Sequence, residues 1–212
     1  MKLVLIRHGE TKANRMIEEG VNLYTGCLNN ELTDLTPEAI KMAKQLSNQD
    51  IIKKINKVYV SDLKRAIDTA KYVKPNFNYI IVPDVRERSL GDFEGKTKEE
   101  LLSIDKYKKY FEDENYMEFR TSFTQKAPNG ENYTEVLNRC MKFLNSLKYS
   151  NKDTIGIISH LAAIRCMMLG ILSFKPRENV FRLKIKNCVP YVFEGEEISK
   201  LKLTSHNLNE LL

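Results

Sequence analysis

The sequence predicts an α/β fold: a three-layer α/β/α sandwich whose mostly parallel central sheet has an antiparallel edge. Leu3–Ile6 and Thr154–Ser159 are apolar runs that are long enough for a strand buried on both faces and too short for a helix. Strand-like and helix-like segments alternate between them, which favours right-handed βαβ crossovers. Near the C-terminus, a turn at 194–196 separates two strand-like segments and predicts an edge hairpin.

The first half of the chain predicts two helices and two more strands. Thr36 is suited to cap a helix, and Pro37 fits the first position of that helix. Ser61 is suited to cap the next helix. Residues 11–33 are polar and irregular, and this length is typical of a functional loop over the site. The expected elements are helix 37–48, strand 57–60, helix 62–73 and strand 78–82.

The second half predicts more helix before the sheet resumes. Thr97 and Glu100 fit a capping box at the start of a helical region that continues to about residue 123. Residues 131–149 have the spacing of an amphipathic helix. The remaining expected elements are strand 154–159, helix 161–172 and strands 181–186, 189–193 and 198–203.

Length and charge limit the function classes. A chain of 212 residues is most simply one domain, here 1–212, with a helical substrate-side subregion at about 96–127. It has no signal-peptide pattern and no apolar run of the roughly 18 residues that a membrane span needs, so we expect a cytoplasmic protein without a membrane partner. The net charge of +6 comes from lysines interspersed with glutamates, which argues against nucleic acid and favours small anionic substrates.

The cysteines do not indicate metal or thiol chemistry. Four cysteines are scattered along the chain, without a CxxC pair or a Cys/His spacing typical of zinc sites. None begins the Cys-x5-Arg loop of the cysteine-dependent phosphatases. We therefore expect a reduced compartment, no metal and no cofactor.

Two of the three histidines occupy equivalent places, since His8 and His160 each follow a buried strand directly. Ligands of open α/β sheets bind at the carboxyl ends of the strands, and a neutral imidazole is a competent nucleophile near pH 7. Arg7 and Arg65 could reach the same place and bind phosphate oxygens through paired hydrogen bonds. The alternative is that these residues have structural roles. Each histidine would then form hydrogen bonds at a strand end, and Arg65 would form a salt bridge with Asp62 or Asp68.

Five blocks of the sequence, in order, resemble the histidine phosphatase superfamily. That superfamily includes cofactor-dependent phosphoglycerate mutases, fructose-2,6-bisphosphatases and α-ribazole phosphatases, and the resemblance implies a phosphoglycerate mutase-like fold. The matching blocks are Arg7–Thr11 with Asn14, Ser61–Ala70, Arg86–Arg88 with Leu90–Gly95, Pro128–Glu131, and Ser159–His160.

The resemblance implies a role for each matching residue. His8 would attack phosphorus and become a phosphohistidine, and Glu87 would protonate the leaving oxygen and later serve as base. The phosphoryl oxygens would be held by Arg7, Arg65 and His160, assisted by Asn14. Glu10 and Glu94 are alternative acids, and an ion pair of Glu87 with Arg86 or Arg88 also stays open.

Departures from the family pattern affect substrate identity. Thr25 and Gly26 keep the shape of the loop after the first block, although Cys27 and Asn29 follow where many members have Trp and Asp. Leu161 stands where many members have Gly, which predicts a narrower and more apolar pocket. Thr25, Gly26 and Leu161 are therefore candidate substrate-binding residues.

A phosphatase is favoured over a mutase. Mutases of the family carry a longer insertion that keeps water from the phosphohistidine, whereas residues 96–127 are compact. We expect a metal-independent phosphatase that acts on a small phosphomonoester; phosphoglycerate mutase and an inactive phosphate-binding module are the alternatives. The leaving group and the oligomeric state stay open. Aromatic residues and Arg120 in the subregion are expected to line or cover the substrate side, unless they form core: Tyr107, Tyr110, Phe111, Tyr116 and Phe119.

Overall fold

The computed structural model describes residues 1–212 and contains one six-stranded sheet, in the order β3-β2-β4-β1-β5-β6. The first four strands of this order are parallel, and β5 and β6 are antiparallel to their neighbours. The mostly parallel sheet and its antiparallel edge are thus confirmed. The strands are β1 (Lys2–Arg7), β2 (Lys57–Val60), β3 (Tyr79–Ile81), β4 (Thr154–Ser159), β5 (Pro190–Glu194) and β6 (Lys202–Leu203).

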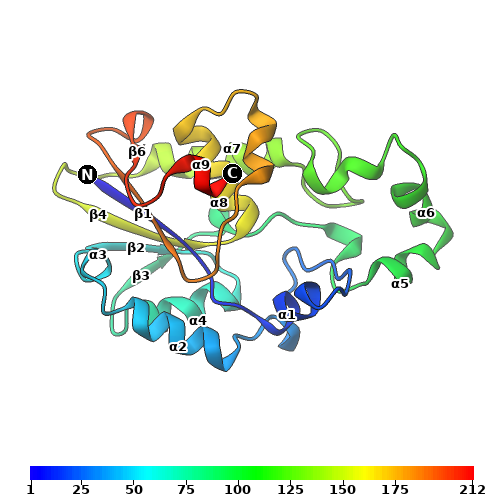
Figure 1. Cartoon of the computed structure of the whole chain (residues 1–212), viewed down its shortest axis with the longest axis horizontal. Coiled ribbons are helices and arrows are strands. Elements are labelled where there is room, and N and C mark those ends of the chain that lie inside the picture. Colours follow the sequence, from blue (N-terminus) through cyan, green and yellow to red (C-terminus); the bar gives the residue numbers. More distant parts are fainter.

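Helices cover both faces of the sheet (Figure 1). α2 and α4 lie on one face and α7 and α8 on the other, while α5 and α6 lie well away from the sheet at one end of the molecule. None of these helices is long and apolar enough to cross a membrane. The helices are α1 (Lys12–Glu18), α2 (Pro37–Leu46), α3 (Asp50–Lys53), α4 (Lys64–Val73), α5 (Lys98–Leu102), α6 (Asp105–Glu112), α7 (Tyr133–Ser146), α8 (Leu161–Leu172) and α9 (Leu208–Leu211).

The apolar side chains of β1 alternate between the two faces of the sheet and contribute to a core on each face. Leu3 and Leu5 pack into the cluster that contains the apolar side chains of α7 and α8. Val4 and Ile6 pack into the cluster of α2 and α4. Successive strand side chains point to opposite faces, so a strand covered by helices on both sides must be apolar throughout. This is why Leu3–Ile6 are four consecutive apolar residues.

The pairing of β1 with β4 brings the two histidines together. These strands are parallel neighbours in a register that places Arg7 opposite Ser159. The next residues are His8 and His160, and the His8 amide donates to the Ser159 carbonyl at 2.9 Å. Both imidazoles therefore stand at the carboxyl end of the sheet.

Two expectations for the polar segments after β1 and β2 were wrong. Residues 11–33 are not irregular throughout, because Thr11 and Asn14 form a capping box that starts α1. The third helical residue of a capping box is usually Glu or Gln, so asparagine at this position makes the box hard to recognise from the sequence. Ser61 caps no helix: α4 begins at Lys64, and the Ser61 hydroxyl bonds to a histidine ring instead.

The expected strand at 181–186 is absent. Residues 177–182 form a 3₁₀ helix, and the next segment runs outside the sheet. Leu183 and Ile185 are buried, which explains the alternating pattern. Their carbonyls accept hydrogen bonds from Arg165 and Arg7 rather than from a neighbouring strand.

Other boundaries differ less. Helix α7 begins at Tyr133, where Asn132 caps it, and ends at Ser146. The capping box of Thr97 and Glu100 is present, but the region after it breaks into α5, α6 and a 3₁₀ helix at Met117–Thr121. The C-terminal hairpin is confirmed with a shorter second strand, β6.

Candidate active site

A cavity of about 220 Å³ opens at the carboxyl end of β1. Seven of the nine residues expected in the site line it, and the two others, Gly26 and His160, lie beside it. The lining residues are Arg7, His8, Thr11, Asn14, Ile17, Glu18, Thr25, Thr33, Arg65, Glu87 and Leu161.

His8 is held as a neutral imidazole with one free nitrogen. Its Nδ1 lies 2.7 Å from the Gly9 carbonyl oxygen. Since a carbonyl only accepts, Nδ1 carries the proton and Nε2 keeps its lone pair. Burial lowers the pKa of His8 well below its usual value, and the Arg65 and Arg7 cations lower it further. The ring is therefore suited to attack an electrophile through Nε2.

His160 lies behind the cavity. Its ring centroid is 5.0 Å from that of His8, and the residue is fully buried. Its Nδ1 accepts a hydrogen bond from Nε of Arg65 at 3.2 Å, so Nε2 carries the proton and donates to the Ser61 hydroxyl at 2.8 Å. Burial, together with Arg65, lowers the pKa of His160 well below its usual value. Both ring nitrogens are thus engaged within the protein.

Arg65 is a buried cation without a carboxylate partner. Besides its bond to His160, its Nη1 and Nη2 donate to the carbonyls of Leu28 and Gly26 at 2.9 and 2.8 Å. One N–H on each of these nitrogens remains for a ligand. The salt bridges considered from the sequence do not form, because Asp68 binds Lys64 and Lys71, and Asp62 binds Arg86.

Arg7 supplies a second guanidinium. Its Nη1 donates to the Ile185 carbonyl at 2.9 Å, and its buried Nε has no hydrogen-bond partner. Burial lowers the pKa of Arg7, while the nearby Glu87 acts in the opposite direction. Two desolvated guanidiniums beside His8 make a strong site for an anion, and phosphate oxygens match their geometry.

Glu87 faces the same cavity, with one oxygen fixed. Its Oε1 accepts hydrogen bonds from the amides of Arg88 and Ala162 at 2.9 and 3.0 Å. No amide binds Oε2, which leaves that oxygen for proton transfer. Neither suggested ion pair forms, because Arg86 binds Asp62 and the Arg88 guanidinium donates to two main-chain carbonyls.

The alternative acids have structural partners. Glu10 binds Arg15 and the Thr36 hydroxyl. Oε1 of Glu94 accepts from the amides of Cys27 and Leu90 and from the Ser89 hydroxyl, so this carboxylate holds the loop at Gly26. Neither residue lines the cavity. Glu18, which does, comes from α1, a helix that the sequence pattern did not predict.

The expected substrate-binding residues surround the cavity in different ways. Oδ1 of Asn14 accepts from the Thr11 amide, which leaves the side-chain NH₂ at the cavity. Gly26 has a φ of +44°, and a Cβ there would lie 2.9 Å from the Leu90 nitrogen, so only glycine fits. Leu161 begins α8 and borders this cavity and both of its neighbours.

A second cavity of about 360 Å³ adjoins Glu87. Three guanidiniums line it, those of Arg88, Arg120 and Arg165, and none of them forms a salt bridge. Tyr24 and Tyr133 stand beside them. Arg165 lies four positions after Leu161 on α8, a spacing that puts both side chains on one helix face and could have marked Arg165, which was not predicted.

Most aromatic residues of the 96–127 subregion form a core of their own, whereas Tyr116 is exposed and Phe123 packs in the larger core cluster. Tyr107 and Phe119 are buried with Phe93 and Tyr24, and Tyr110 and Phe111 pack against them. Only Arg120 of the six expected substrate-side residues lines a cavity of the site.

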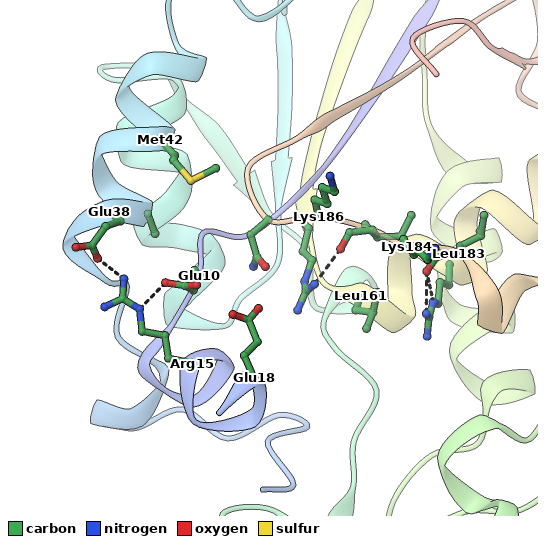
Figure 2. Close-up of a pocket in the computed structure, with 14 residues that line it drawn as sticks. Glu10, Arg15, Glu18, Glu38, Met42, Leu161, Leu183, Lys184 and Lys186 are labelled. Atoms are coloured by element: carbon green, nitrogen blue, oxygen red, sulfur yellow. Dashed lines mark hydrogen bonds and ion pairs between the residues drawn. The ribbon is translucent and has the colours of Figure 1, made fainter. Parts of the chain in front are cut away.

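The largest neighbouring cavity, about 640 Å³, shares Arg7, Glu18 and Leu161 with the cavity at His8. Figure 2 shows Arg15 between Glu10 and Glu38 on its wall, with Glu18 nearby. It contains neither His8 nor Glu87, so it adjoins the reaction centre without enclosing it.

Comparison with known proteins gives concordant results. The family model described as Histidine phosphatase superfamily (branch 1) matches residues 3–208. Phosphoglycerate mutase-like protein 4 of Arabidopsis thaliana is 31% identical over 175 residues, covering 78% of this chain and 69% of the relative. The adenosylcobalamin/α-ribazole phosphatase of Salmonella typhimurium is 27% identical, covering 88% and 86%. A crystal structure of phosphoserine phosphatase from Entamoeba histolytica, in complex with phosphoserine, is 27% identical with a TM-score of 0.72, covering 100% and 98%.

Proposed function

The chain belongs to the histidine phosphatase superfamily, and on this basis we propose that it hydrolyses a small phosphomonoester through a phosphohistidine on His8. One observation carries the proposal: His8 presents an unprotonated Nε2 beside two guanidiniums that have no carboxylate partner. A nucleophile and a dianion site therefore share one cavity. Carboxylate-free guanidiniums in a buried site favour a doubly charged ligand over neutral ones.

In the first step, Nε2 of His8 attacks phosphorus while the P–O bond to the leaving group breaks. Glu87 gives its proton to the leaving oxygen, so the product departs as an alcohol. The Gly9 carbonyl keeps the Nδ1 proton in place throughout, which stabilises the positive charge that develops on the ring.

In the second step, Glu87 takes a proton from water and the water oxygen attacks phosphorus. The P–N bond breaks, inorganic phosphate is released, and His8 returns to its neutral form. The same carboxylate thus serves as acid and then as base, and its fixed Oε1 leaves Oε2 to carry the proton in both steps.

Arg7 and Arg65 stabilise the phosphoryl group, and Asn14 adds an amide donor. Charge builds up on the equatorial oxygens in phosphoryl transfer, so fixed cations at these oxygens lower the barrier. We assign His160 to the positioning of Arg65, since its ring nitrogens bind Arg65 and Ser61. With two guanidiniums in this role, we propose that the reaction needs no metal ion.

The leaving group would occupy the cavity beside Glu87, because the leaving oxygen must lie within reach of the acid. Its three guanidiniums have no carboxylate partner, and they favour a leaving group with an acidic substituent, such as a carboxylate. Phosphoserine, bound by the Entamoeba histolytica relative, is a compound of this kind.

The test is hydrolysis of p-nitrophenyl phosphate in the presence of EDTA, with wild type and His8→Ala. Release of phosphate by wild type and its loss in the variant support the proposal. No release by either protein would instead favour an inactive binding module. Phosphoryl exchange among phosphoglycerates that exceeds phosphate release would favour a mutase.

A further inference from the structure

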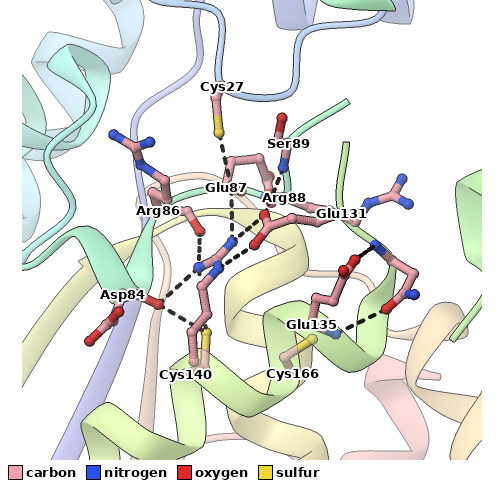
Figure 3. A network of polar contacts seen from close by, with 12 residues as sticks. Cys27, Asp84, Arg86, Glu87, Arg88, Ser89, Glu131, Glu135, Cys140 and Cys166 are labelled. Atoms are coloured by element: carbon pink, nitrogen blue, oxygen red, sulfur yellow. Dashed lines mark hydrogen bonds and ion pairs between the residues drawn. The ribbon is translucent and has the colours of Figure 1, made fainter. Parts of the chain in front are cut away.

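Arg139 on α7 donates its guanidinium N–H groups to the loop that carries Glu87 and to Glu131. Figure 3 shows this loop, with Asp84, Arg86 and Glu87, and the Glu131 side chain close to it. Nη1 of Arg139 donates to the carbonyls of Asp84 and Arg86 at 2.8 and 2.9 Å, and its Nη2 donates to the carbonyl of Glu87 at 3.0 Å. The two remaining N–H groups bind the carboxylate of Glu131 at 2.8 and 2.9 Å. Arginine has five N–H donors, so none is left over.

Glu131 and Arg139 together form a clamp on the loop 84–89. The carboxylate of Glu131 neutralises Arg139 and also accepts a hydrogen bond from the Ser89 amide at 2.9 Å. The main-chain amide of Glu131 donates to the Ser89 carbonyl at 2.9 Å. The loop 84–89 is therefore fixed through three carbonyls near its start and through both main-chain groups of Ser89.

This clamp bears directly on the Glu87 carboxylate. Oε1 of Glu87 is held by two amides, one from the adjacent Arg88 and one from Ala162 at the start of α8. Both bonds require that the loop keep its place relative to α8. A loop displaced by an ångström would move the carboxylate away from the leaving oxygen, and proton transfer depends steeply on such distances.

We propose that Arg139 is a positioning residue for the general acid, acting through the main chain of residues 84–87. The inference rests on the proposed function, in which Glu87 protonates the leaving oxygen. Arg139 lines none of the cavities of the site and its side chain is only 16% exposed, so it has no part in substrate binding.

The test uses the dependence of the rate on the leaving group. The nitrophenolate of p-nitrophenyl phosphate is stable enough to leave as an anion, whereas the alkoxide of an alkyl phosphate must receive a proton as it leaves. A misplaced acid therefore slows alkyl phosphates far more than p-nitrophenyl phosphate. The measured quantity is the ratio of kcat/KM for two substrates, because kcat/KM reports the step in which the leaving group departs, whereas hydrolysis of the phosphohistidine is common to both. The substrates are the best alkyl phosphomonoester among phosphoserine, 3-phosphoglycerate and glycerol 3-phosphate, and p-nitrophenyl phosphate.

We expect Arg139→Gln to lower this ratio by about 10-fold or more, since general acid catalysis as a whole contributes roughly 10²- to 10⁴-fold. Arg139→Lys keeps the cation and three donors, so it should recover part of the loss. Val136→Ala is the matched control, because Val136 is a fully buried residue of the same helix whose apolar side chain cannot donate to the loop's carbonyls. It should lower stability and leave the ratio unchanged.

Each outcome bears on one claim. A ratio unchanged in Arg139→Gln, or lowered equally in Val136→Ala, overturns the positioning role while the phosphatase activity stands. Glu87→Gln must lower the ratio at least as much as Arg139→Gln; if wild type hydrolyses neither substrate, the proposed function itself fails. Should Arg139→Gln not fold, a ratio reduced in Arg139→Lys supports the proposal and an unchanged ratio overturns it.

Discussion

Nε of Arg65 lies 3.2 Å from Nδ1 of His160, and this bond joins a cation to an imidazole that the family resemblance assigns to the phosphoryl group directly. The bond requires an unprotonated Nδ1, so His160 must be neutral while it holds Arg65. The fully buried ring then fixes a guanidinium that no carboxylate holds. We therefore propose that His160 acts on the phosphoryl group through Arg65.

Removal of the acceptor on His160 should weaken the anion site. We expect His160→Ala to lower kcat/KM by about 10- to 100-fold, because a hydrogen bond to a charged group contributes roughly 1.5–3 kcal/mol. His160→Asn places a carbonyl oxygen near the position of Nδ1 and should recover most of the loss. Steady-state kinetics and inhibition by inorganic phosphate measure both effects. An Asn variant no better than Ala would argue against the Arg65 role.

Replacement of Glu87 should separate substrates by their leaving groups. Glu87→Gln keeps an oxygen for the amides of Arg88 and Ala162 but cannot give or take a proton. We expect kcat for alkyl phosphates to fall by about 10²- to 10⁴-fold, with a much smaller effect on the phosphorylation step of p-nitrophenyl phosphate. Pre-steady-state measurement isolates that step. Equal losses for both substrates would mean that another group is the acid.

The guanidiniums beside Glu87 should select acidic leaving groups. Arg120→Gln and Arg165→Gln should each lower kcat/KM for 3-phosphoglycerate relative to glycerol 3-phosphate by roughly 10-fold, the scale of one charge-assisted hydrogen bond. Arg177→Gln is the control, since Arg177 pairs with Glu178 away from the cavities. A wild type that shows no preference for the acidic substrate would refute this part of the proposal.

Stability should fall below about pH 6.5. The pKa values of His8 and His160 are well below that value in the folded protein, so the unfolded chain binds protons that the folded one does not. Stability is therefore complete above this pH and is lost as the pH falls, by up to about 1.4 kcal/mol per pH unit for each group. Urea unfolding between pH 7 and pH 5 measures the slope, which His8→Gln should reduce by the contribution of one group. A slope unaffected by His8→Gln would contradict the buried neutral imidazole.

The sequence predicts the centre of the site better than its surroundings. Arg7, His8 and His160 are predictable because buried parallel strands end beside one another, a relation that apolar runs reveal. Ser61 was misassigned because a hydroxyl at a helix start can cap the helix or bind a ring, and only the position of His160 decides between these roles. The prediction of a strand at 181–186 was wrong because alternating apolar residues indicate which side chains are buried. They do not indicate whether the main-chain carbonyls accept hydrogen bonds from a neighbouring strand or from side chains.

The role of Arg139 was hidden for a related reason. Its partners on the loop are main-chain carbonyls, which every residue possesses, so no residue type in the loop marks the contact. The three guanidiniums beside Glu87 were hidden as well, because an arginine without a carboxylate partner has the same sequence pattern as one in a surface ion pair.

The covalent intermediate tests the account most directly. Wild type and His8→Asn would be mixed with a radiolabelled phosphomonoester, quenched within milliseconds in base, and analysed for labelled protein and for its stability in acid. We predict that wild type carries a base-stable, acid-labile label on His8 and that the variant carries none. An acid-stable label, or the same label in the variant, would contradict nucleophilic attack by His8.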